Sequence, residues 1–480
     1  MKQTHVAVLL RDAVYTVRPL QTLTIHISPF YLHNVLTSDF RFPNSPPVSS
    51  FKIHGGKPLS GSIETGYAKN SAVALISASL MTSEPTTLKN VPKIEEVFRF
   101  EEIFKSLGIG WEWQNERDLI ITPPEKINFK KIDYEAALKT RSIIYLIGAL
   151  INSHESFTIP RAGGCKLGNR STMSHFFALE ELGMKYKFIE GYYEVYRPKP
   201  LKGKHLVMYE SGDTTTNNLI MAAALAEGTT EVTMASANYM VQDLCHFLNK
   251  MGAKIEGIGS TTLTIHGVTK LKGISYEIMH DPIESMFWIS LAATTNSEIT
   301  IKNCPFDFLE IELYKLSKMN FRYTLTPSDP KIKSNFKLVD ITTKQSKLEA
   351  LDDKIYARPY PGLNIDNLPY FVPIACRAEG RSLIFDWAYE NRAIYYLELQ
   401  KLGANILLAD PHRAIIEGPI DFKPNEVICP PALRPATMLL CAMLQAKGTS
   451  ILRNTYPIDR GHEDIYERLR MLGADIEEME

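Results

Sequence analysis

The stretch NNLIMAAALAEG, Asn217–Gly228, decides the fold of this chain because it is apolar around nearly its whole circumference as a helix. A helix with no polar face has to be buried on all sides. Comparable runs occur five more times in the 480 residues: Lys69–Met81, Thr140–Ile151, Ser285–Asn296, Pro369–Gly380 and Ala436–Gly448. The repeating unit spans roughly 65 to 85 residues, and such self-similarity predicts a repeat architecture.

Each apolar run is followed by a strand rich in Thr, Val and Ile and then by an amphipathic helix. In the third unit, residues Val241, Leu244, Cys245, Leu248 and Met251 share one helix face. Each amphipathic helix ends in a stop signal, usually a glycine, which takes a left-handed backbone readily. The six stops are Leu107-Gly108, Leu182-Gly183, Met251-Gly252, Met319-Asn320, Leu402-Gly403 and Leu472-Gly473.

These patterns predict an α/β fold of an unusual kind, an inside-out α/β barrel of six repeated units with buried helices and outer sheets. Neighbouring units complete one another's core, so six units divide into two domains of three. We expect one domain over residues 69–280. The other combines residues 51–68 with residues 281–480, because strand-like segments at Phe51–Gly56 and Ser60–Gly66 can pair with the C-terminal half. The cleft between two such domains is a favoured site for small molecules.

Residues 1–50 stand outside the repeat and end in the linker-like NSPPVSS, Asn44–Ser50. We expect a family-specific extension, and a transit peptide is the alternative because basic residues dominate its start. The formal net charge of −1 argues against a nucleic-acid or membrane-surface binder. The six cysteines show no metal-ligand spacing and predict free thiols in a reducing compartment.

One loop, RAGGCKLGNR at Arg161–Arg170, combines glycines, a cysteine and cations. Glycine lets backbone approach a ligand closely, and nearby cations favour reactivity at Cys165. A glycine-rich surface turn with an incidental cysteine explains the composition equally well.

Charged residues also mark the ends of the buried helices. Lys69, Arg141 and Arg434 stand at equivalent positions, where each apolar run begins. A cation at a helix N-terminus opposes the helix dipole unless an anion is shared. Three of them therefore predict a site for a multiply charged anion. The other polar residues at such positions are Asn70, Asp366 and Arg392.

At these residues the sequence resembles the enolpyruvyl transferases, over about residues 51–480, and within them the branch that acts on UDP-N-acetylglucosamine. Six motifs carry the resemblance: TGYAKNSA at Thr65–Ala72, GGCKLGNR at Gly163–Arg170, NLIMAAALAEGTTEV at Asn218–Val232, LNKMGAKIEGIG at Leu248–Gly259, YENRA at Tyr389–Ala393, and IDRGHEDIYERLRMLGADIE at Ile458–Glu477. The resemblance implies the two-domain, inside-out fold. It also implies transfer of the enolpyruvyl group of phosphoenolpyruvate to the 3-hydroxyl of UDP-N-acetylglucosamine, the first committed step of peptidoglycan synthesis, without metal or cofactor.

The resemblance further implies roles for single residues. Lys69, Arg170 and Arg434 correspond to the residues that hold the phosphate and carboxylate of phosphoenolpyruvate, with Arg141 in support. Cys165 corresponds to the loop cysteine that assists protonation of C3. Asp366 corresponds to the base beside the sugar hydroxyl. The acceptor-binding set implied by the family is Asn70, Arg141, Arg170, His175, Asp366 and Arg392.

The sequence departs from the family pattern mainly around the acceptor. After Arg170 the family has Pro-Val-Asp-Leu-His, whereas this chain has Ser171–His175, with Met173 in place of the aspartate. The family's Lys-x-Ser-Val-Gly is replaced by Glu210–Thr214, which contains two acids, and acids beside a pyrophosphate are costly. Phe-Pro-Thr-Asp before the base has become Leu363–Asp366.

Three hypotheses follow. The first is a transferase that uses UDP-N-acetylglucosamine, and the second keeps the reaction but changes the acceptor to another nucleotide or sugar. The third is a non-catalytic relative that binds a nucleotide sugar. Shikimate 3-phosphate is disfavoured as the acceptor, because the AKN and GGC motifs belong to the aminosugar branch. We expect a monomer acting on small molecules in the cytoplasm, or in a plastid if the extension is a transit peptide.

Overall fold

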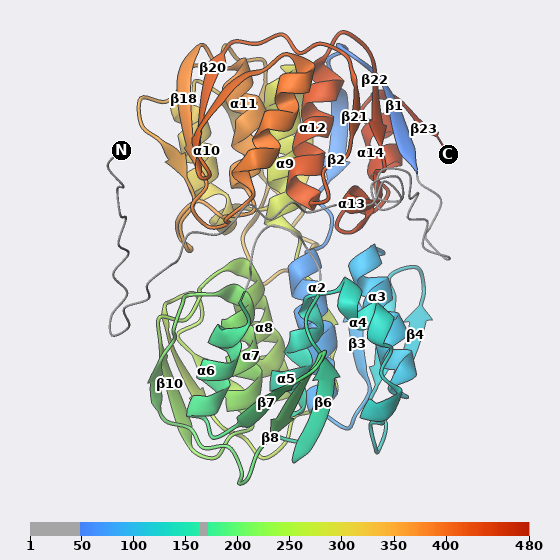
Figure 1. Cartoon of the computed structure of the whole chain (residues 1–480), viewed down its shortest axis with the longest axis vertical. Coiled ribbons are helices and arrows are strands. Elements are labelled where there is room, and N and C mark those ends of the chain that lie inside the picture. The colour runs from blue at the N-terminus through green and yellow to red at the C-terminus, as the bar shows by residue number, and fades with distance from the viewer. Residues whose placement is uncertain (1–48, 164–170, 480) are drawn as a thin grey trace, which may run out of the picture. The chain divides into compact units, whose positions relative to one another are not determined.

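The computed structural model describes residues 49–163 and 171–479 as a mixed α/β structure (Figure 1). All six apolar runs form helices, as predicted. Three of these helices follow or precede short 3-10 turns: η1 (Ser79–Met81), η3 (Ser142–Ile144) and η5 (Leu368–Tyr370). The six α-helices are α2 (Lys69–Ala78), α5 (Tyr145–Leu150), α7 (Asp213–Ala224), α9 (Pro282–Thr295), α11 (Phe371–Arg377) and α12 (Leu433–Gln445).

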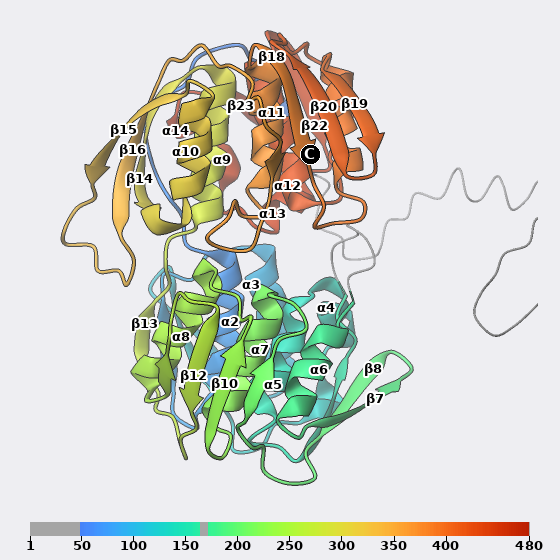
Figure 2. The ribbon, with the colours of Figure 1, turned by 90° about the vertical axis from the view of Figure 1, so that its left-hand side faces the viewer.

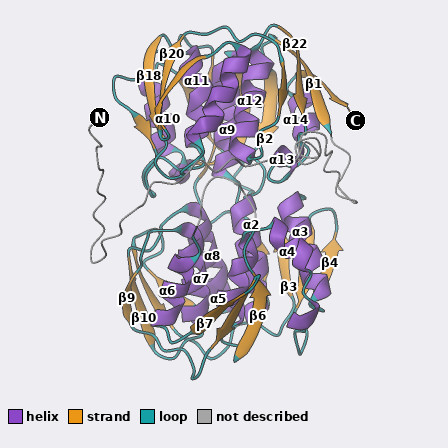
Figure 3. Cartoon of the chain, viewed as in Figure 1, coloured by secondary structure: helices purple, strands orange, loops and turns teal. Residues whose placement is uncertain are grey.

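The burial of these helices is nearly complete. In α9 every residue from Pro282 to Thr294 is buried. Helices α9, α11 and α12 pack against one another. Strands flank this group on both sides (Figure 3). The apolar surface of these helices is thus covered by neighbouring helices and strands, as expected for helices without a polar face.

The helices of the N-terminal units form the first group, and α9, α11 and α12 form the second; the first group differs from the expectation in one respect. Helix α8 (Tyr239–Met251) was predicted to be an outer amphipathic helix, and its predicted apolar face is indeed buried. It nevertheless packs directly against α2 and α7, while α5 closes the group by contacting α2 and α7 as well (Figure 2). The first group therefore contains four packed helices, because α8 fills the space between α2 and α7.

A close helix contact explains why small residues recur in these runs. Gly148 of α5 donates its backbone N–H to Oδ1 of Asn218 on α7 at 2.7 Å. A Cβ atom on Gly148 would lie 2.2 Å from the carbonyl oxygen of Asn218. Only glycine allows the two backbones to approach this closely.

The predicted helix stops all have left-handed backbones. Gly252 has a φ of 110°, and Asn320, the one non-glycine stop, has a φ of 62°. Asparagine tolerates this region better than other residues with a Cβ. The remaining helices and 3-10 turns are α3 (Glu95–Ser106), η2 (Phe129–Lys131), α4 (Tyr134–Lys139), α6 (Met173–Glu181), η4 (Phe306–Phe308), α10 (Glu310–Lys318), η6 (Ala393–Leu402), α13 (Tyr456–Asp459) and α14 (Ile465–Met471).

Six sheets accompany the six buried helices in the described residues. Three belong to the N-terminal units. Their strand orders are β13-β3-β5-β4 (Ser275–Glu277, Thr86–Lys89, Asp118–Thr122, Gly110–Gln114), β6-β8-β7 (Ser156–Pro160, Tyr192–Tyr196, Lys185–Ile189) and β11-β12-β10-β9 (Lys254–Glu256, Thr262–His266, Thr229–Thr233, His205–Val207).

The other three sheets repeat the same plan. Their orders are β15-β16-β14-β2 (Arg322–Pro327, Leu338–Lys344, Glu298–Pro305, Ser60–Glu64), β17-β18-β20-β19 (Ile355–Tyr356, Gly380–Phe385, Arg413–Gly418, Asn405–Asp410) and β21-β22-β1-β23 (Glu426–Ile428, Gly448–Arg453, Ser50–Gly55, Asp475–Met479). In each of them the strand that follows the buried helix (β14, β18 or β22) pairs antiparallel with the other central strand of the sheet (β16, β20 or β1).

The start of the described chain pairs with its C-terminal half, as predicted. Strand β1 lies between β22 and β23, antiparallel to both. Strand β2 runs parallel to β14. After β2 the chain passes from the C-terminal units to α2, and it returns from the N-terminal units just before α9. The two connecting segments lie side by side, because the N–H of Ala68 donates to the carbonyl of Met279 at 2.8 Å.

Several features bear on the predicted class of protein. Cys245, Cys304, Cys376, Cys429 and Cys441 are free and buried, which agrees with a reading as small core residues. In the described part of the chain no helix is long and apolar enough to span a bilayer. The same residues contain no group of three or more potential metal ligands from His, Cys, Asp and Glu.

The α5–α7 contact can be tested by replacing Gly148 with alanine. The added methyl would meet the backbone of Asn218, so we expect the variant to be less stable by about 3 kcal/mol. The measurement is the shift of the urea unfolding midpoint. Gly252→Ala is the matched control: its new methyl meets nothing within 4 Å, and only the left-handed backbone costs about 1 kcal/mol. Equal losses in the two variants would contradict the close packing.

Candidate active site

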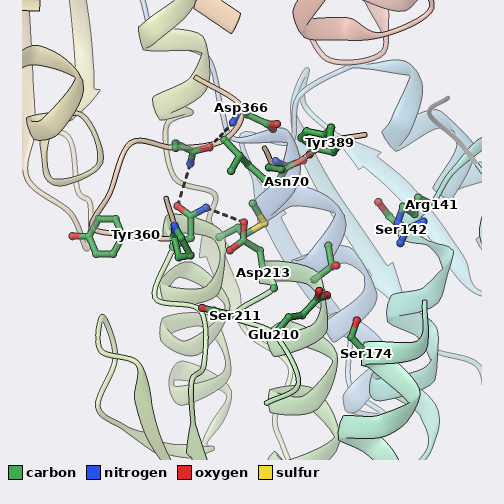
Figure 4. Close-up of a pocket in the computed structure, with 18 of the residues that line it drawn as sticks. Asn70, Arg141, Ser142, Ser174, Glu210, Ser211, Asp213, Tyr360, Asp366 and Tyr389 are labelled. Carbon is green, nitrogen blue, oxygen red and sulfur yellow. Dashed lines mark hydrogen bonds between the residues drawn. The ribbon is translucent and has the colours of Figure 1, made fainter. Parts of the chain in front are cut away.

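A pocket of about 920 Å³ is lined by both groups of helices. One wall carries the starts of α2, α6 and α7, including Lys69, Met173 and Asp213. The other wall carries the loop before η5, the segment from Trp387 to Glu390, and the start of α12. The N-termini of buried helices thus open into one cavity (Figure 4). Such termini present free N–H groups and favour anions.

Most of the predicted site residues that the structure describes meet in this pocket. Cys165 and Arg170 lie outside the described residues, although Ser171, which follows Arg170, lines the pocket. Arg392 does not line it. The predicted residues that do line it are Lys69, Asn70, Arg141, His175, Asp366 and Arg434.

A buried carboxylate organises the cationic end of the pocket. Oε2 of Glu96 lies 3.8 Å from Nζ of Lys69 and 3.5 Å from Nη2 of Arg460. Its Oε1 accepts hydrogen bonds from the hydroxyls of Thr140 at 2.5 Å and Ser142 at 3.2 Å. Burial raises the pKa of this carboxyl, but the two cations and the hydroxyls outweigh burial and hold the pKa below its usual value. Glu96 therefore stays ionised and fixes both cations.

A second charge cluster surrounds Arg434, which is only 7% exposed. Its Nη2 lies 3.5 Å from Oδ2 of Asp366. Asp281, the N-cap of α9, accepts the backbone N–H of Lys69 at 3.4 Å. Burial raises the pKa of Asp281 to about 6, although Arg434 works against the shift. The pocket thus places a guanidinium directly beside the carboxylate that was predicted to be the base.

The remaining predicted residues form hydrogen bonds within the pocket wall. Nδ2 of Asn70 donates to the hydroxyl of Tyr239 at 2.9 Å. His175 is almost fully buried, with Nδ1 at 3.1 Å from Nδ2 of Asn218 and Nε2 at 3.4 Å from the hydroxyl of Thr214. Arg141 donates to the carbonyl of Ser171 at 3.0 Å and so holds the residue that follows the glycine-rich loop.

Comparisons with known proteins identify the family. The model for EPSP synthase (3-phosphoshikimate 1-carboxyvinyltransferase) matches residues 53–469. The UDP-N-acetylglucosamine 1-carboxyvinyltransferases of Treponema denticola and Bacteroides thetaiotaomicron are 35% and 33% identical to this chain. The alignments cover 90% and 89% of this chain and 99% of each relative. The chain belongs to the EPSP synthase family of enolpyruvyl transferases.

Solved structures agree on the fold. The enolpyruvyl transferase NikO from Streptomyces tendae superposes with a TM-score of 0.77 at 22% identity, over 90% of this chain and 99% of that one. An EPSP synthase from Acinetobacter baumannii gives a TM-score of 0.68 at 18% identity, over 90% of this chain and 100% of that one. At these identities the likeness establishes the enolpyruvyl transferase fold alone.

Arg392 occupies a different place from the one the family resemblance implied. Its guanidinium is fully buried and pairs with both oxygens of Asp386, at 2.6 and 2.7 Å. Tyr396 donates to the same carboxylate at 2.6 Å. The guanidinium also lies over the ring of Tyr389, 4.3 Å from its centroid. Because Tyr389 lines the pocket, Arg392 reaches this enolpyruvyl transferase site through a neighbour.

The two acids that replace neutral or basic family residues behave differently. Glu210 is exposed and lines the pocket. Asp213 also lines it, but its two oxygens accept hydrogen bonds from the Ser236 hydroxyl at 2.5 Å and from Nδ2 of Asn238 at 2.9 Å. Burial raises the pKa of Asp213, and those hydrogen bonds oppose the shift. Of these two acids, only Glu210 is exposed in the pocket.

Sequence reasoning missed Arg460 and Glu96. Arg460 stands inside the quoted motif at Ile458–Glu477, so the motif itself was the available signal. Glu96 lies on α3 without any recognised motif, and only its burial among cations reveals its importance. The exposed aromatic pair Phe177 and Tyr209, with ring centroids 5.4 Å apart, also lines the pocket and was not predicted.

The role of Glu96 predicts a pH-dependent stability loss in Glu96→Gln. Its folded pKa lies below the unfolded value of 4.5, so its stabilising contribution is present above that pH and is lost as the pH falls through the folded pKa. We expect a loss of about 2 kcal/mol at pH 7, because two cations lose their counter-charge. The difference from wild type should shrink below about pH 4.

Urea unfolding at several pH values measures this effect. Glu102→Gln on the same helix is the control, since Glu102 is exposed and pairs with Arg99 of that helix. A Glu96→Gln deficit that stays constant from pH 7 to pH 3 would contradict the assignment.

Proposed function

We propose that this enolpyruvyl transferase moves the enolpyruvyl group of phosphoenolpyruvate to the 3-hydroxyl of UDP-N-acetylglucosamine and releases phosphate, the first committed step of peptidoglycan synthesis. The names of the relatives that are 33–35% identical over about nine-tenths of the chain support this acceptor. The single observation that carries the chemistry is the convergence of Lys69, Arg434 and Arg460 in one pocket that also contains Asp366.

The cations match the charge of the donor substrate. Phosphoenolpyruvate carries about three negative charges at neutral pH, and fixed cations stabilise such charge without reorganising. Lys69 and Arg460 are held in place by Glu96, and Arg434 is nearly buried. In this proposal Lys69, Arg170, Arg434 and Arg460 bind the phosphate and carboxylate, and Arg141 supports them from the second unit.

The reaction proceeds by addition and elimination. The thiol of Cys165, protonated at neutral pH as an ordinary thiol is, gives a proton to C3 while C2 becomes electron-poor. The 3-hydroxyl oxygen then bonds to C2, and its proton passes to Asp366. The bond between C2 and the phosphate oxygen breaks next, the Cys165 thiolate takes a proton back from C3, and the enol ether and phosphate leave. Neither a metal nor an organic cofactor enters these steps.

The acceptor is oriented by side chains of both walls. Asn70 and Arg141 line the pocket and can donate hydrogen bonds to the acceptor. His175 on α6 contacts Asn218 on α7 and so holds the two helices together. Arg392 contributes by holding Tyr389. Enclosure of the substrates between the helix groups keeps water from the reactive intermediate.

The proposal extends to the architecture and the setting of the enzyme. The buried helices and their flanking sheets support an inside-out α/β barrel arrangement, with domains over residues 69–280 and residues 51–68 plus 281–480. Each helix group closes its core within one chain, which supports a monomer acting on small molecules. Neither a nucleic acid nor a membrane has a part in this reaction. The proposed location is the cytoplasm, with a plastid as the alternative.

One observation favours a second candidate function, the same reaction on a different nucleotide or sugar. Glu210 is an exposed carboxylate in the pocket, at a position where the family pattern has lysine. A carboxylate repels a pyrophosphate unless a cation intervenes. The non-catalytic hypothesis has less support, because a binder has no need of Asp366 beside Arg434.

The proposed function is tested by phosphate release from phosphoenolpyruvate with UDP-N-acetylglucosamine, UMP or buffer as parallel acceptors. We expect release with UDP-N-acetylglucosamine and none in buffer. Cys165→Ser should lower turnover at least about a hundredfold without changing the unfolding midpoint. Release with UMP alone would reassign the acceptor, and silence with all acceptors would favour the non-catalytic hypothesis.

The acid in the acceptor wall gives a sharper test of substrate choice. In Glu210→Lys the pocket gains a cation where the acceptor's phosphates are expected, so KM for UDP-N-acetylglucosamine should fall several-fold, by roughly 1 kcal/mol of binding. The KM for phosphoenolpyruvate should stay the same. Glu190→Lys, an equal charge change in an exposed turn, is the control. An unchanged acceptor KM in Glu210→Lys would show that no phosphate lies near this wall.

A further inference from the structure

A chain of hydrogen bonds joins two positions at which this sequence departs from its family. Asp213 stands at the start of α7, and Asn364 stands two residues before the proposed base, where the family pattern has proline. Among the described residues no hydrogen bond joins Asp213 directly to Asn364. Asn238, the N-cap of α8, lies between them and bonds to both.

The links are short and consecutive. Nδ2 of Asn238 donates to Oδ2 of Asp213 at 2.9 Å. Nδ2 of Asn364 donates to Oδ1 of Asn238 at 3.3 Å. The backbone N–H of Asp366 donates to Oδ1 of Asn364 at 2.9 Å. The relay therefore runs from a carboxylate on the first helix group to the backbone of Asp366 on the second.

Backbone N–H groups fix the direction of the relay. A backbone N–H only donates hydrogen bonds, and that of Tyr239 donates to Oδ1 of Asn238. The Asn238 oxygen is therefore shared with Asn364, and its amino group faces Asp213. The backbone N–H of Asp366 requires the oxygen of Asn364, which turns the Asn364 amino group toward Asn238. Both amides have a single orientation that satisfies every bond.

Further contacts hold each end of the relay. Oδ1 of Asn238 also accepts the N–H of Tyr239 at 2.9 Å, and Asn238 is 7% exposed. On the other side, buried Glu312 accepts the backbone N–H of Asn364 at 3.0 Å and Nδ2 of Asn367 at 2.9 Å. The loop that carries Asp366 is thus anchored from both helix groups.

We infer that Asp213, Asn238 and Asn364 are positioning residues, which hold the Asp366 carboxylate beside Arg434 for proton removal from the acceptor hydroxyl. This inference rests on the proposed function, because it takes Asp366 as the base. Misplacement of a catalytic group by a fraction of its reach slows the chemical step with little effect on substrate binding. The inference also gives Asp213 a role: its carboxyl group accepts a hydrogen bond from Asn238, so it is not a second free acid in the acceptor wall.

The first test removes the middle of the relay. Asn364→Ala loses the bonds to Asn238 and to the N–H of Asp366 but keeps its own N–H bond to Glu312. We expect kcat for phosphate release to fall roughly tenfold to a hundredfold, with KM for phosphoenolpyruvate within about twofold of wild type. An unchanged kcat would overturn the inference.

The second test exchanges donor and acceptor. Asn238→Asp puts two carboxylates face to face and should lose kcat, whereas in Asp213→Asn the new amide oxygen can still accept from Nδ2 of Asn238, so its kcat should stay close to that of wild type. The double variant Asp213→Asn with Asn238→Asp restores a donor opposite an acceptor and keeps the acceptor oxygen for Asn364. We expect its kcat to recover to within about threefold of wild type. A double variant no better than the worse single variant would overturn the relay.

A stability readout separates positioning from folding. Asn152→Ala is the control, because it removes an amide bonded to the carbonyl of Ala222 on the same helix α7, away from Asp366. It should leave kcat unchanged. If all kcat losses follow the fraction of unfolded protein, the positioning role is overturned. A wild type that releases no phosphate with any acceptor overturns the proposed function instead, while recovery of the unfolding midpoint in the double variant still tests the relay.

Discussion

The burial of six apolar helices is the constraint on which the rest of the structure depends. A helix without a polar face cannot lie at the surface, so its charged residues gather near its ends. Lys69, Arg141, Asp213, Asp366 and Arg434 all stand at or just before the start of such a helix, and all line one pocket. The packing that removes apolar surface from water thereby collects charge at the helix N-termini.

Charges gathered in this way need partners, and the pocket supplies them in pairs. Glu96 balances Lys69 and Arg460, while Asp366 lies beside Arg434. Glu96 is a single carboxylate facing two cations, so this cluster keeps one uncompensated positive charge. An incoming anion therefore finds cations already fixed in position, so that little reorganisation is needed at the moment of reaction.

Two hydrogen-bonded networks extend the same order to the pocket walls. Arg392 and Asp386 form a bidentate pair in the core, and the guanidinium of that pair lies over the ring of Tyr389. The relay from Asp213 through Asn238 does the equivalent for Asp366 through amides, within the pocket wall itself. In both networks a residue acts on the site through a neighbour. A variant in either is therefore expected to alter geometry more than charge.

The sequence alone determined the six-unit repeat, the left-handed stops at residues such as Gly252 and Asn320, the pairing of β1 and β2 with the C-terminal half, and the motifs that place the chain among enolpyruvyl transferases. These features are local or periodic, so residue order reveals them. Only the tertiary structure decided that α8 packs inside its group, that Arg392 is buried, and that Glu96, Arg460 and Asn238 serve the site. Their roles depend on which distant side chains meet them after folding, and no spacing in the sequence encodes such contacts.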